Sequence, residues 1–218
     1  MVNPRQARKL LDAVREESQR GAHLQAFFGC LYHAGLRPGE AVWLRRSNCE
    51  LPLKGWGVLN LDGSRPRVGS AWTDSGKAHD ERGLKWRPRK DVRHVPIPPP
   101  FVAMLRAHIE AYGTAPDGRL FQTSRGGLVQ ESGYGEVWQR ARKKALTPEQ
   151  QASPMAGRPY GLRHACVSLW LNSGVDPVEV AKRAGHSVAV LLRVYAKCLD
   201  GTASLANARI EKALKQWE

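Results

Sequence analysis

A tyrosine near the end of the chain raises the first question of chemistry. Tyr195 stands in LLRVYAKCLDG (residues 191–201), between Arg193 and Lys197. A tyrosine in such a place can be a packed core aromatic or a nucleophile. As a nucleophile it needs cations or a base close by, because a free phenol has a pKa near 10 and only about one in a thousand is ionised at pH 7.

The two neighbouring cations are poorly placed for this task. At about 100° per residue of helix, Arg193 and Lys197 nearly share a face, and Tyr195 points roughly 160° away from each. In a helix they would face solvent or phosphates. Groups that act on Tyr195 must therefore come from distant parts of the sequence.

Two distant segments offer such groups. The segment AGLRPGEAVWLR (34–45) carries Arg37 and, three residues later, Glu40. The segment from residue 158 to residue 200 carries Arg163 and then His186, which precedes Tyr195 by nine residues. A guanidinium group stays charged and binds two phosphate oxygens with its planar fork, so both arginines are candidate anion ligands.

The net charge indicates a polyanionic partner. Thirty-four Lys and Arg oppose twenty Asp and Glu, which gives a formal charge of +14. Nucleic acid is the commonest such partner, and an anionic membrane surface is the alternative, although no long basic amphipathic helix stands out. Charge alone does not indicate an enzyme.

Other sequence features bear on the compartment. No run approaches 18 apolar residues, so no membrane span is expected, and the N-terminus is too charged for a signal peptide. The four cysteines form no CxxC pair, which favours reduced thiols over a zinc site. We therefore expect a cytoplasmic, nucleoid-associated protein.

Residue patterns predict a mostly helical α+β domain with a small antiparallel sheet. Caps and helical spacing predict helices at 3–14, 22–34, 38–44 and 132–145, and another that begins after the prolines at 98–100 and runs to 112. Alternation predicts strands near 56–61, 68–73 and 92–97, and residues 147–159 are expected to form a loop. In the last sixty residues the pattern predicts four short helices, separated by Gly174, Gly185 and Gly201.

Taken together, the motifs resemble the catalytic domain of tyrosine recombinases, the phage-integrase family. The matching boxes are AGLRPGE with Arg37, YGLRH with Arg163, AGH with His186, and Tyr195 nine residues later. The family's R-x-VP-[IL]-P segment is matched by Arg93 to Pro98. The resemblance runs from about residue 5 to the end of the chain.

This resemblance implies a site-specific recombinase or integrase that cleaves and rejoins double-stranded DNA through a 3′-phosphotyrosine link. Tyr195 would be the nucleophile, with Arg37 and Arg163 on the non-bridging oxygens and His186 bonded to a phosphate oxygen. Glu40 and His164 would orient the arginines. The link conserves the phosphodiester energy, so no cofactor or metal is expected.

The resemblance also implies a lysine on the hairpin that protonates the departing 5′-oxygen. Lys85, in GLKWR just before the closing strand, is the first choice. Lys77 and Lys90 remain alternatives, because this hairpin is longer than is usual in the family.

Two departures from the family pattern stand out. Tyr160 replaces the first family histidine; it can donate one hydrogen bond to a phosphate oxygen but cannot carry a proton near neutral pH. The chain also begins where the catalytic domain would begin, so the family's N-terminal core-binding domain is expected to be absent. We expect a single catalytic domain over residues 1–218, with a long hairpin insertion at about 50–98 and a C-terminal helix at about 202–217.

Two other functions stay open from the sequence alone. One is a DNA-binding module of the same fold whose catalysis has decayed, which the Tyr160 departure motivates. The other is a type IB topoisomerase, which uses similar chemistry without partner subunits. As a recombinase the chain would form dimers or tetramers on DNA, with the C-terminal helix docked either on a neighbouring protomer or in cis.

Overall fold

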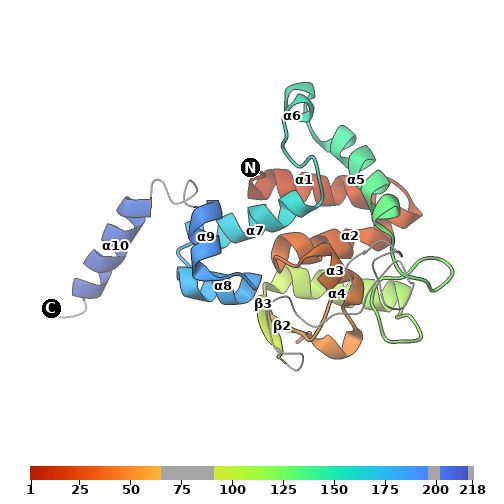
Figure 1. Ribbon diagram of the computed structural model, residues 1–218, viewed down its shortest axis with the longest axis horizontal. Coiled ribbons are helices and arrows are strands. Elements are labelled where there is room, and N and C mark those ends of the chain that lie inside the picture. The colour runs from red at the N-terminus through yellow and green to blue at the C-terminus, as the bar shows by residue number, and fades with distance from the viewer. Residues whose placement is uncertain (65–90, 196–201, 216–218) are drawn as a thin grey trace. The chain divides into compact units, whose positions relative to one another are not determined.

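The computed structural model describes residues 1–64, 91–195 and 202–215, and these residues are mostly helical with one small sheet (Figure 1). They divide into two compact units, Met1–Cys166 and Val167–Glu218. The predicted fold class, α+β and mostly helical, is confirmed. That the whole chain acts as one catalytic domain stays a prediction.

Six α-helices precede residue 153 among the residues that the structure describes. They are α1 (Pro4–Arg15), α2 (Gln19–His33), α3 (Pro38–Trp43), α4 (Pro99–Tyr112), α5 (Glu131–Ala145) and α6 (Pro148–Ala152). The first five confirm the predicted helices. The loop expected over 147–159 was wrong in its first part, because Thr147 and Gln150 form a capping box that starts α6 at Pro148.

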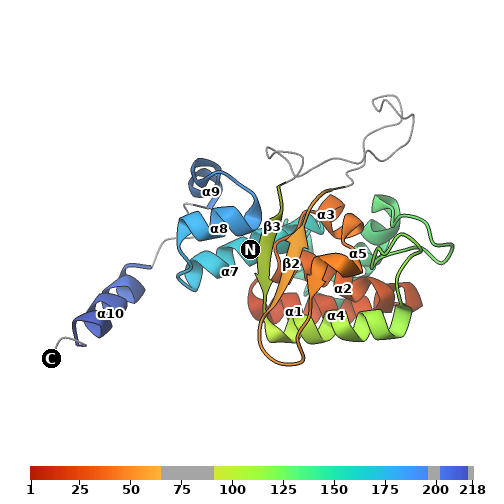
Figure 2. The ribbon, with the colours of Figure 1, turned by 90° about the horizontal axis from the view of Figure 1, so that it is seen from below.

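Aromatic side chains hold α2 and α5 together in the core of the first unit. The ring centroids of Phe27 and Tyr134 are 4.9 Å apart, and those of Phe28 and Trp138 are 5.0 Å apart. The indole nitrogen of Trp138 donates to the Ala156 carbonyl at 2.7 Å. Figure 2 shows α4 running beside α2, on the side of the helices that also carries the strands.

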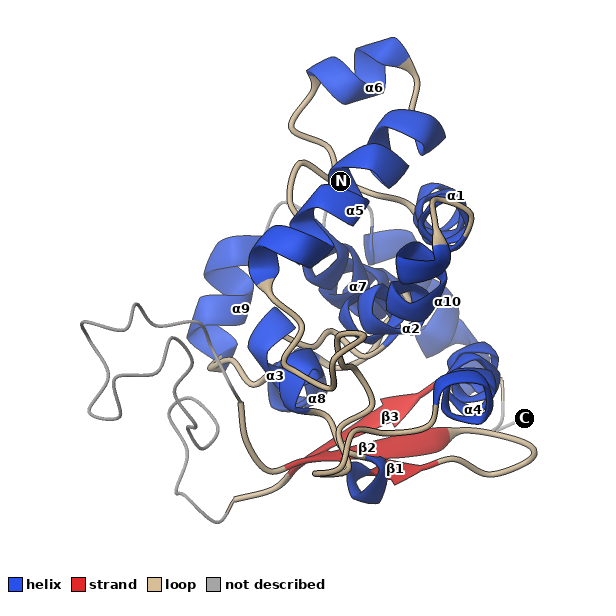
Figure 3. Ribbon diagram, turned by 90° about the vertical axis from the view of Figure 1, so that its right-hand side faces the viewer, coloured by secondary structure: helices blue, strands red, loops and turns tan. Residues whose placement is uncertain are grey.

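Among the described residues the sheet has three antiparallel strands, in the order β1 (Cys49–Glu50), β2 (Gly57–Leu61) and β3 (Arg93–Ile97) (Figure 3). The strands predicted near 56–61 and 92–97 are confirmed. The strand predicted near 68–73 lies outside the described residues, and β1, which follows a short 3₁₀ turn at Arg46–Asn48, was not predicted.

Strand alternation decides which residues of β3 face the core. In the sheet register Leu59 pairs with Val95 and Leu61 pairs with Arg93, and all four side chains are buried. Arg93 therefore shares the inner face of the sheet with apolar residues.

Four short helices, as predicted, make up the last part of the chain: α7 (Tyr160–Asn172), α8 (Pro177–Ala184), α9 (Val188–Tyr195) and α10 (Thr202–Leu214). The α7 helix begins in the first unit and ends in the second. Arg209 of α10 donates to the carbonyls of Ser173 and Gly174 in the turn after α7, at 2.9 and 3.1 Å. Within the described ranges no helix has the length and apolar character to cross a bilayer.

The half-buried His33 makes the stability of the first unit sensitive to acid. The His33 ring stacks on Phe101, with centroids 5.1 Å apart and 20° between the planes. Burial lowers the pKa of His33 from 6.5 to about 4. Between pH 6.5 and pH 4 the His33 side chain is protonated more in the unfolded chain than in the folded one. The folded state therefore keeps its full stability with respect to His33 above pH 6.5 and loses stability as the pH falls toward 4.

We predict that His33→Gln, which cannot ionise, flattens this dependence. The free energy of unfolding of the parent should fall by about 1–2 kcal/mol more than that of the variant between pH 7.5 and pH 5. Urea unfolding at the two pH values measures the difference. Equal losses in parent and variant would contradict the assignment.

Candidate active site

A buried carboxylate stands at the centre of the predicted site in the first unit. Glu40 lies on α3 and is only 1% exposed. One of its oxygens, Oε1, accepts from Nη1 of Arg37 at 2.8 Å and from Nη1 of Arg93 at 2.9 Å. The other, Oε2, accepts from Nη2 of Arg93 at 2.7 Å and from the backbone N–H of Arg37 at 2.8 Å.

Local backbone rules place Arg37 and Glu40 next to each other. Gly35 has φ 59°, a left-handed conformation that suits glycine, and so the chain can leave α2 and turn toward α3. Arg37 is the N-cap of α3 and Pro38 fills its first turn. Glu40 is the third residue of the helix, so its side chain reaches back to the capping N–H.

Arg93, on β3, forms a bidentate ion pair with Glu40 through Nη1 and Nη2. Its side chain is buried, with 3% of the residue exposed. Sequence reasoning noticed Arg93 only as the start of the R-x-VP-I-P segment and gave it no role in the site. The single available signal was a charged residue at an inward-facing strand position, flanked at alternate positions by apolar residues.

Arg163 approaches the same turn from α7. It is fully buried, and its Nη1 donates a hydrogen bond to the Gly35 carbonyl. Burial lowers the pKa of Arg163, the charge of Glu40 opposes that shift, and the neighbouring Arg37 and Arg93 add to it. The arginines of the two predicted boxes are therefore close enough to sense each other's charge.

The charge balance of this cluster is unusual for a protein interior. Burial alone would raise the pKa of Glu40, but the Arg93 guanidinium, with Arg37 and Arg163 adding to it, lowers that pKa to about 2. The carboxylate is therefore ionised throughout the physiological range. Among the described residues, Glu40 is bonded to Arg37 and Arg93 and its charge also acts on Arg163, so guanidinium groups that can bind an anion are gathered around one carboxylate.

Tyr160 and His164 lie beside Arg163 on the first turns of α7. Their rings are 5.1 Å apart and nearly perpendicular, and the guanidinium carbon of Arg163 lies 6.0 Å from the Tyr160 ring centroid. Burial and the charge of Arg163 lower the pKa of His164. His164 is therefore neutral at pH 7.

His186 and Tyr195 belong to the second unit. Gly185, in the left-handed conformation, ends α8, and the His186 N–H closes the turn on the Ala181 carbonyl at 3.0 Å. The Ser187 hydroxyl then accepts from Val190 N–H at 3.2 Å and starts α9. The AGH box is thus the junction between two helices.

The nine-residue step to the tyrosine spans α9, whose last residue is Tyr195. The Tyr195 side chain is 1% exposed, whereas Arg193 is exposed. The two residues therefore face in different directions, as helical spacing predicts.

The first unit brings together Arg37, Glu40 and Arg163, with Tyr160 and His164 alongside. The second unit carries His186 and Tyr195. Lys85 and its alternatives Lys77 and Lys90 lie outside the described residues. Within the described part of the chain, no group of three or more His, Cys, Asp or Glu side chains is arranged to hold a metal ion.

The Arg93–Glu40 pair yields a stability prediction. Arg93→Met removes one partner of a buried ion pair and should lower the free energy of unfolding by about 3 kcal/mol or more, measured by urea unfolding at pH 7. Arg93→Lys keeps the charge but loses the fork and should fall between parent and Met variant.

Arg8 on α1 offers a matched control. Its side chain is 87% exposed and it meets Asp12 only at 4.0 Å, so Arg8→Met should cost less than about 0.5 kcal/mol. Equal small losses for Arg93→Met and Arg8→Met would show that the buried pair does not hold α3 to the sheet.

Known proteins resemble this chain in sequence. Two curated relatives are tyrosine recombinases XerC. That of Methylobacterium sp. (strain 4-46) is 28% identical over 176 residues, covering 79% of this chain and 44% of the relative. That of Halalkalibacterium halodurans is 25% identical over 190 residues, covering 86% and 54%. The chain thus spans about half the length of the curated relatives it matches.

A solved structure shares the fold. The Tn1549 transposon integrase, in complex with transposon right end DNA, matches with a TM-score of 0.73 at 21% identity, over 98% of this chain and 65% of that one. The model of the phage integrase family matches residues 1–201, a range that includes both arginine boxes, the AGH box and Tyr195. The chain belongs to the phage integrase family.

Proposed function

We propose that this chain is a tyrosine-type DNA strand transferase, a site-specific recombinase that cleaves and rejoins double-stranded DNA through Tyr195. The observation that carries the proposal is the cluster of Arg37, Arg93 and Arg163 around the buried Glu40. Family membership over residues 1–201 supports it. So does the net charge of +14.

The arginine cluster suits the transition state of phosphoryl transfer. Negative charge on the non-bridging oxygens must be stabilised while the nucleophile and leaving group stay in line. Arg37 keeps 21% of its side chain exposed, and its bond to Glu40 orients the guanidinium. Arg163 would supply the second guanidinium group, which is held by its hydrogen bond to the Gly35 carbonyl in the turn between α2 and α3.

The remaining groups complete the reaction. The Tyr195 oxygen would attack the phosphorus, forming a 3′-phosphotyrosine bond as the bond to the 5′-oxygen breaks. Lys85 would give its proton to that oxygen, and His186 and Tyr160 would donate hydrogen bonds to phosphate oxygens. Because Tyr195 is 1% exposed, its phenol has to become accessible before attack.

Partners follow from the same proposal. The DNA partner would bring the chain to the nucleoid. The α10 helix exposes Ile210 by 58% and Leu214 by 52%, an apolar pair that supports docking on a neighbouring protomer within a dimer or tetramer. Packing of α10 in cis is the competing arrangement.

A second candidate is a DNA-binding module of the same fold without catalysis. Tyr160 in place of the family histidine favours it. Like the recombinase, such a module would bind DNA with an affinity that falls steeply as the salt concentration rises. Unlike the recombinase, it would form no covalent adduct with any DNA site.

A nicked suicide DNA substrate, built from the DNA flanking the coding sequence, tests the proposal. We predict a covalent protein–DNA adduct with the parent chain and none with Tyr195→Phe. Arg37→Gln should slow adduct formation by about 10²–10³ because a transition-state donor is lost. Denaturing gel electrophoresis of end-labelled DNA measures the adduct.

Arg193→Gln provides the control, since this exposed neighbour of Tyr195 should leave the rate within about threefold of the parent. An adduct formed by Tyr195→Phe would sink the assignment of the nucleophile. Salt-sensitive binding without any adduct would favour the binding module.

A further inference from the structure

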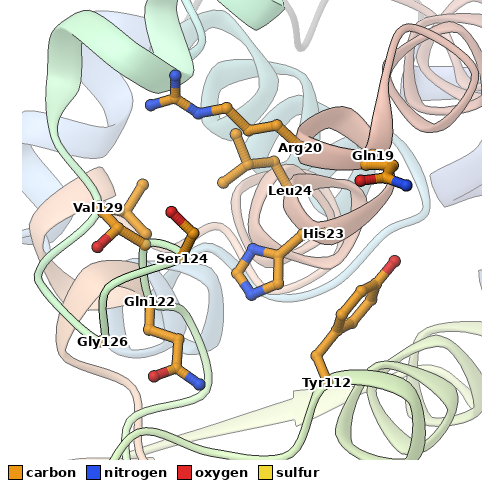
Figure 4. Close-up of a pocket in the computed structure, with 10 residues that line it drawn as sticks. Gln19, Arg20, His23, Leu24, Tyr112, Gln122, Ser124, Gly126 and Val129 are labelled. Carbon is orange, nitrogen blue, oxygen red and sulfur yellow. The ribbon is translucent and has the colours of Figure 1, made fainter.

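A pocket of about 630 Å³ lies in the first unit, at the start of α2. The first two turns of α2, the end of α4 and the segment before α5 line it (Figure 4). Glu40 and the arginine cluster follow the other end of α2, which at 15 residues is about 22 Å long. The pocket is therefore remote from the proposed DNA chemistry.

The segment before α5 is a tight turn with a fixed backbone. Thr123 N–H donates to the Gly127 carbonyl and Gly126 N–H donates to the Thr123 carbonyl, both at 2.9 Å. The Thr123 hydroxyl also accepts from Gly127 N–H at 3.0 Å. The turn is thus held by its own bonds, and the side chains of Gln122 and Ser124 are not needed to hold it.

Several polar side chains around the pocket lack hydrogen-bond partners in the part of the chain that the structure describes, although His23 and Tyr112 pack against other rings. Within the described residues, the side chains of Arg20, His23, Tyr112, Gln122 and Ser124 make no hydrogen bond or ion pair. His23 and Gln122 are half-buried. In Figure 4 Ser124, Gln122 and Tyr112 are drawn around His23, and the guanidinium of Arg20 extends away from them. They form a ready set of donors and acceptors for a ligand.

The aromatic groups offer a setting for a flat ring. His23 meets Tyr112 edge to face, with centroids 4.9 Å apart and 76° between the planes. Burial, and then the neighbouring His108, lower the pKa of His23 to about 4, so at pH 7 the ring is neutral and offers one donor and one acceptor. Edge-to-face and stacked contacts with such rings favour planar heteroaromatic ligands.

Arg20 gives the pocket its charge. Its guanidinium lies so close to α5 that a Cβ at Gly133 would come within 1.7 Å of Nη2, so the glycine makes room for it. Among the described residues that line the pocket there is no Asp or Glu. The nearby Glu17 is itself bonded to Arg140 and Ser18. The charge of Arg20 acts on Glu17, but its N–H groups make no hydrogen bond among the described residues and can bind an anionic group.

We propose that this pocket binds a mononucleotide, a ligand that joins a planar base to a phosphate. The volume falls within the range of about 300–1,000 Å³ typical of small-molecule sites and exceeds what a lone phosphate needs. The Gln122 amide can both donate to and accept from the edge of a purine, as Gln does with adenine. Arg20 would bind the phosphate, and the His23–Tyr112 pair would contact the base.

Calorimetric titration of the 218-residue chain with adenosine monophosphate tests this site. We expect saturable binding that weakens about tenfold or more in Arg20→Gln and in Gln122→Ala, since each loses a direct polar contact. Gly133→Ala should weaken it similarly, because the added methyl displaces Arg20. Thermal melting confirms that each variant is folded, and Gln122→Ala covers the case in which Gly133→Ala is not.

Arg8→Gln is the matched control, because it removes the same charge from the exposed surface of α1 and should change the affinity less than about twofold. Tyr195→Phe should bind as the parent does, so this result is independent of strand transfer. The absence of binding, or an equal loss in Arg8→Gln, would overturn the site.

Three further titrations separate the ligand class. Adenosine binding as tightly as the nucleotide would remove the role of Arg20. Inorganic phosphate binding as tightly would remove the role of the base. Displacement of the nucleotide by duplex DNA at an equal concentration of phosphates would show that the pocket is part of the DNA surface and contradict the proposal.

Discussion

The ion pair between Glu40 and Arg93 is the interaction on which the rest of the first unit's site depends. Glu40 is almost completely buried, and four hydrogen bonds from two arginines satisfy its oxygens. The same pair links α3 to β3, elements separated by more than fifty positions in the chain. Buried ion pairs add little net stability, but they cost several kcal/mol when one partner is lost, and so they favour one arrangement over others.

The position of Glu40 explains how three arginine side chains can lie close together in the folded protein. Three guanidinium groups near one another repel, and burial makes each charge more costly. Glu40 offsets part of this cost, because its carboxylate is bonded to Arg37 and Arg93 and its charge acts on Arg163. Arg163 is fixed through the Gly35 carbonyl, so the same glycine that ends α2 also anchors the second arginine. The second unit carries His186 and Tyr195.

Much of this could be predicted from local sequence signals. Asn3 and Gly185 mark helix ends through capping, and the boxes around Arg37 and Arg163 identified the two arginines. The role of Arg93 could not be predicted, because strand pairing and the tertiary contact with Glu40 decide it. The α6 helix was missed because a loop-like composition hid a capping box. The pocket at the start of α2 could not be predicted from the sequence either, because the residues that line it come from three separate segments.

The pKa of Glu40 tests the central claim most directly. The carboxyl carbon of Glu40, assigned by comparison with Glu40→Gln, can be followed by ¹³C NMR as the pH is lowered. If the guanidinium cluster holds this carboxylate, its chemical shift should stay constant from pH 7 to about 3.5 while the protein remains folded. Titration of Glu40 at the ordinary value of about 4.3 in the folded protein would contradict the account.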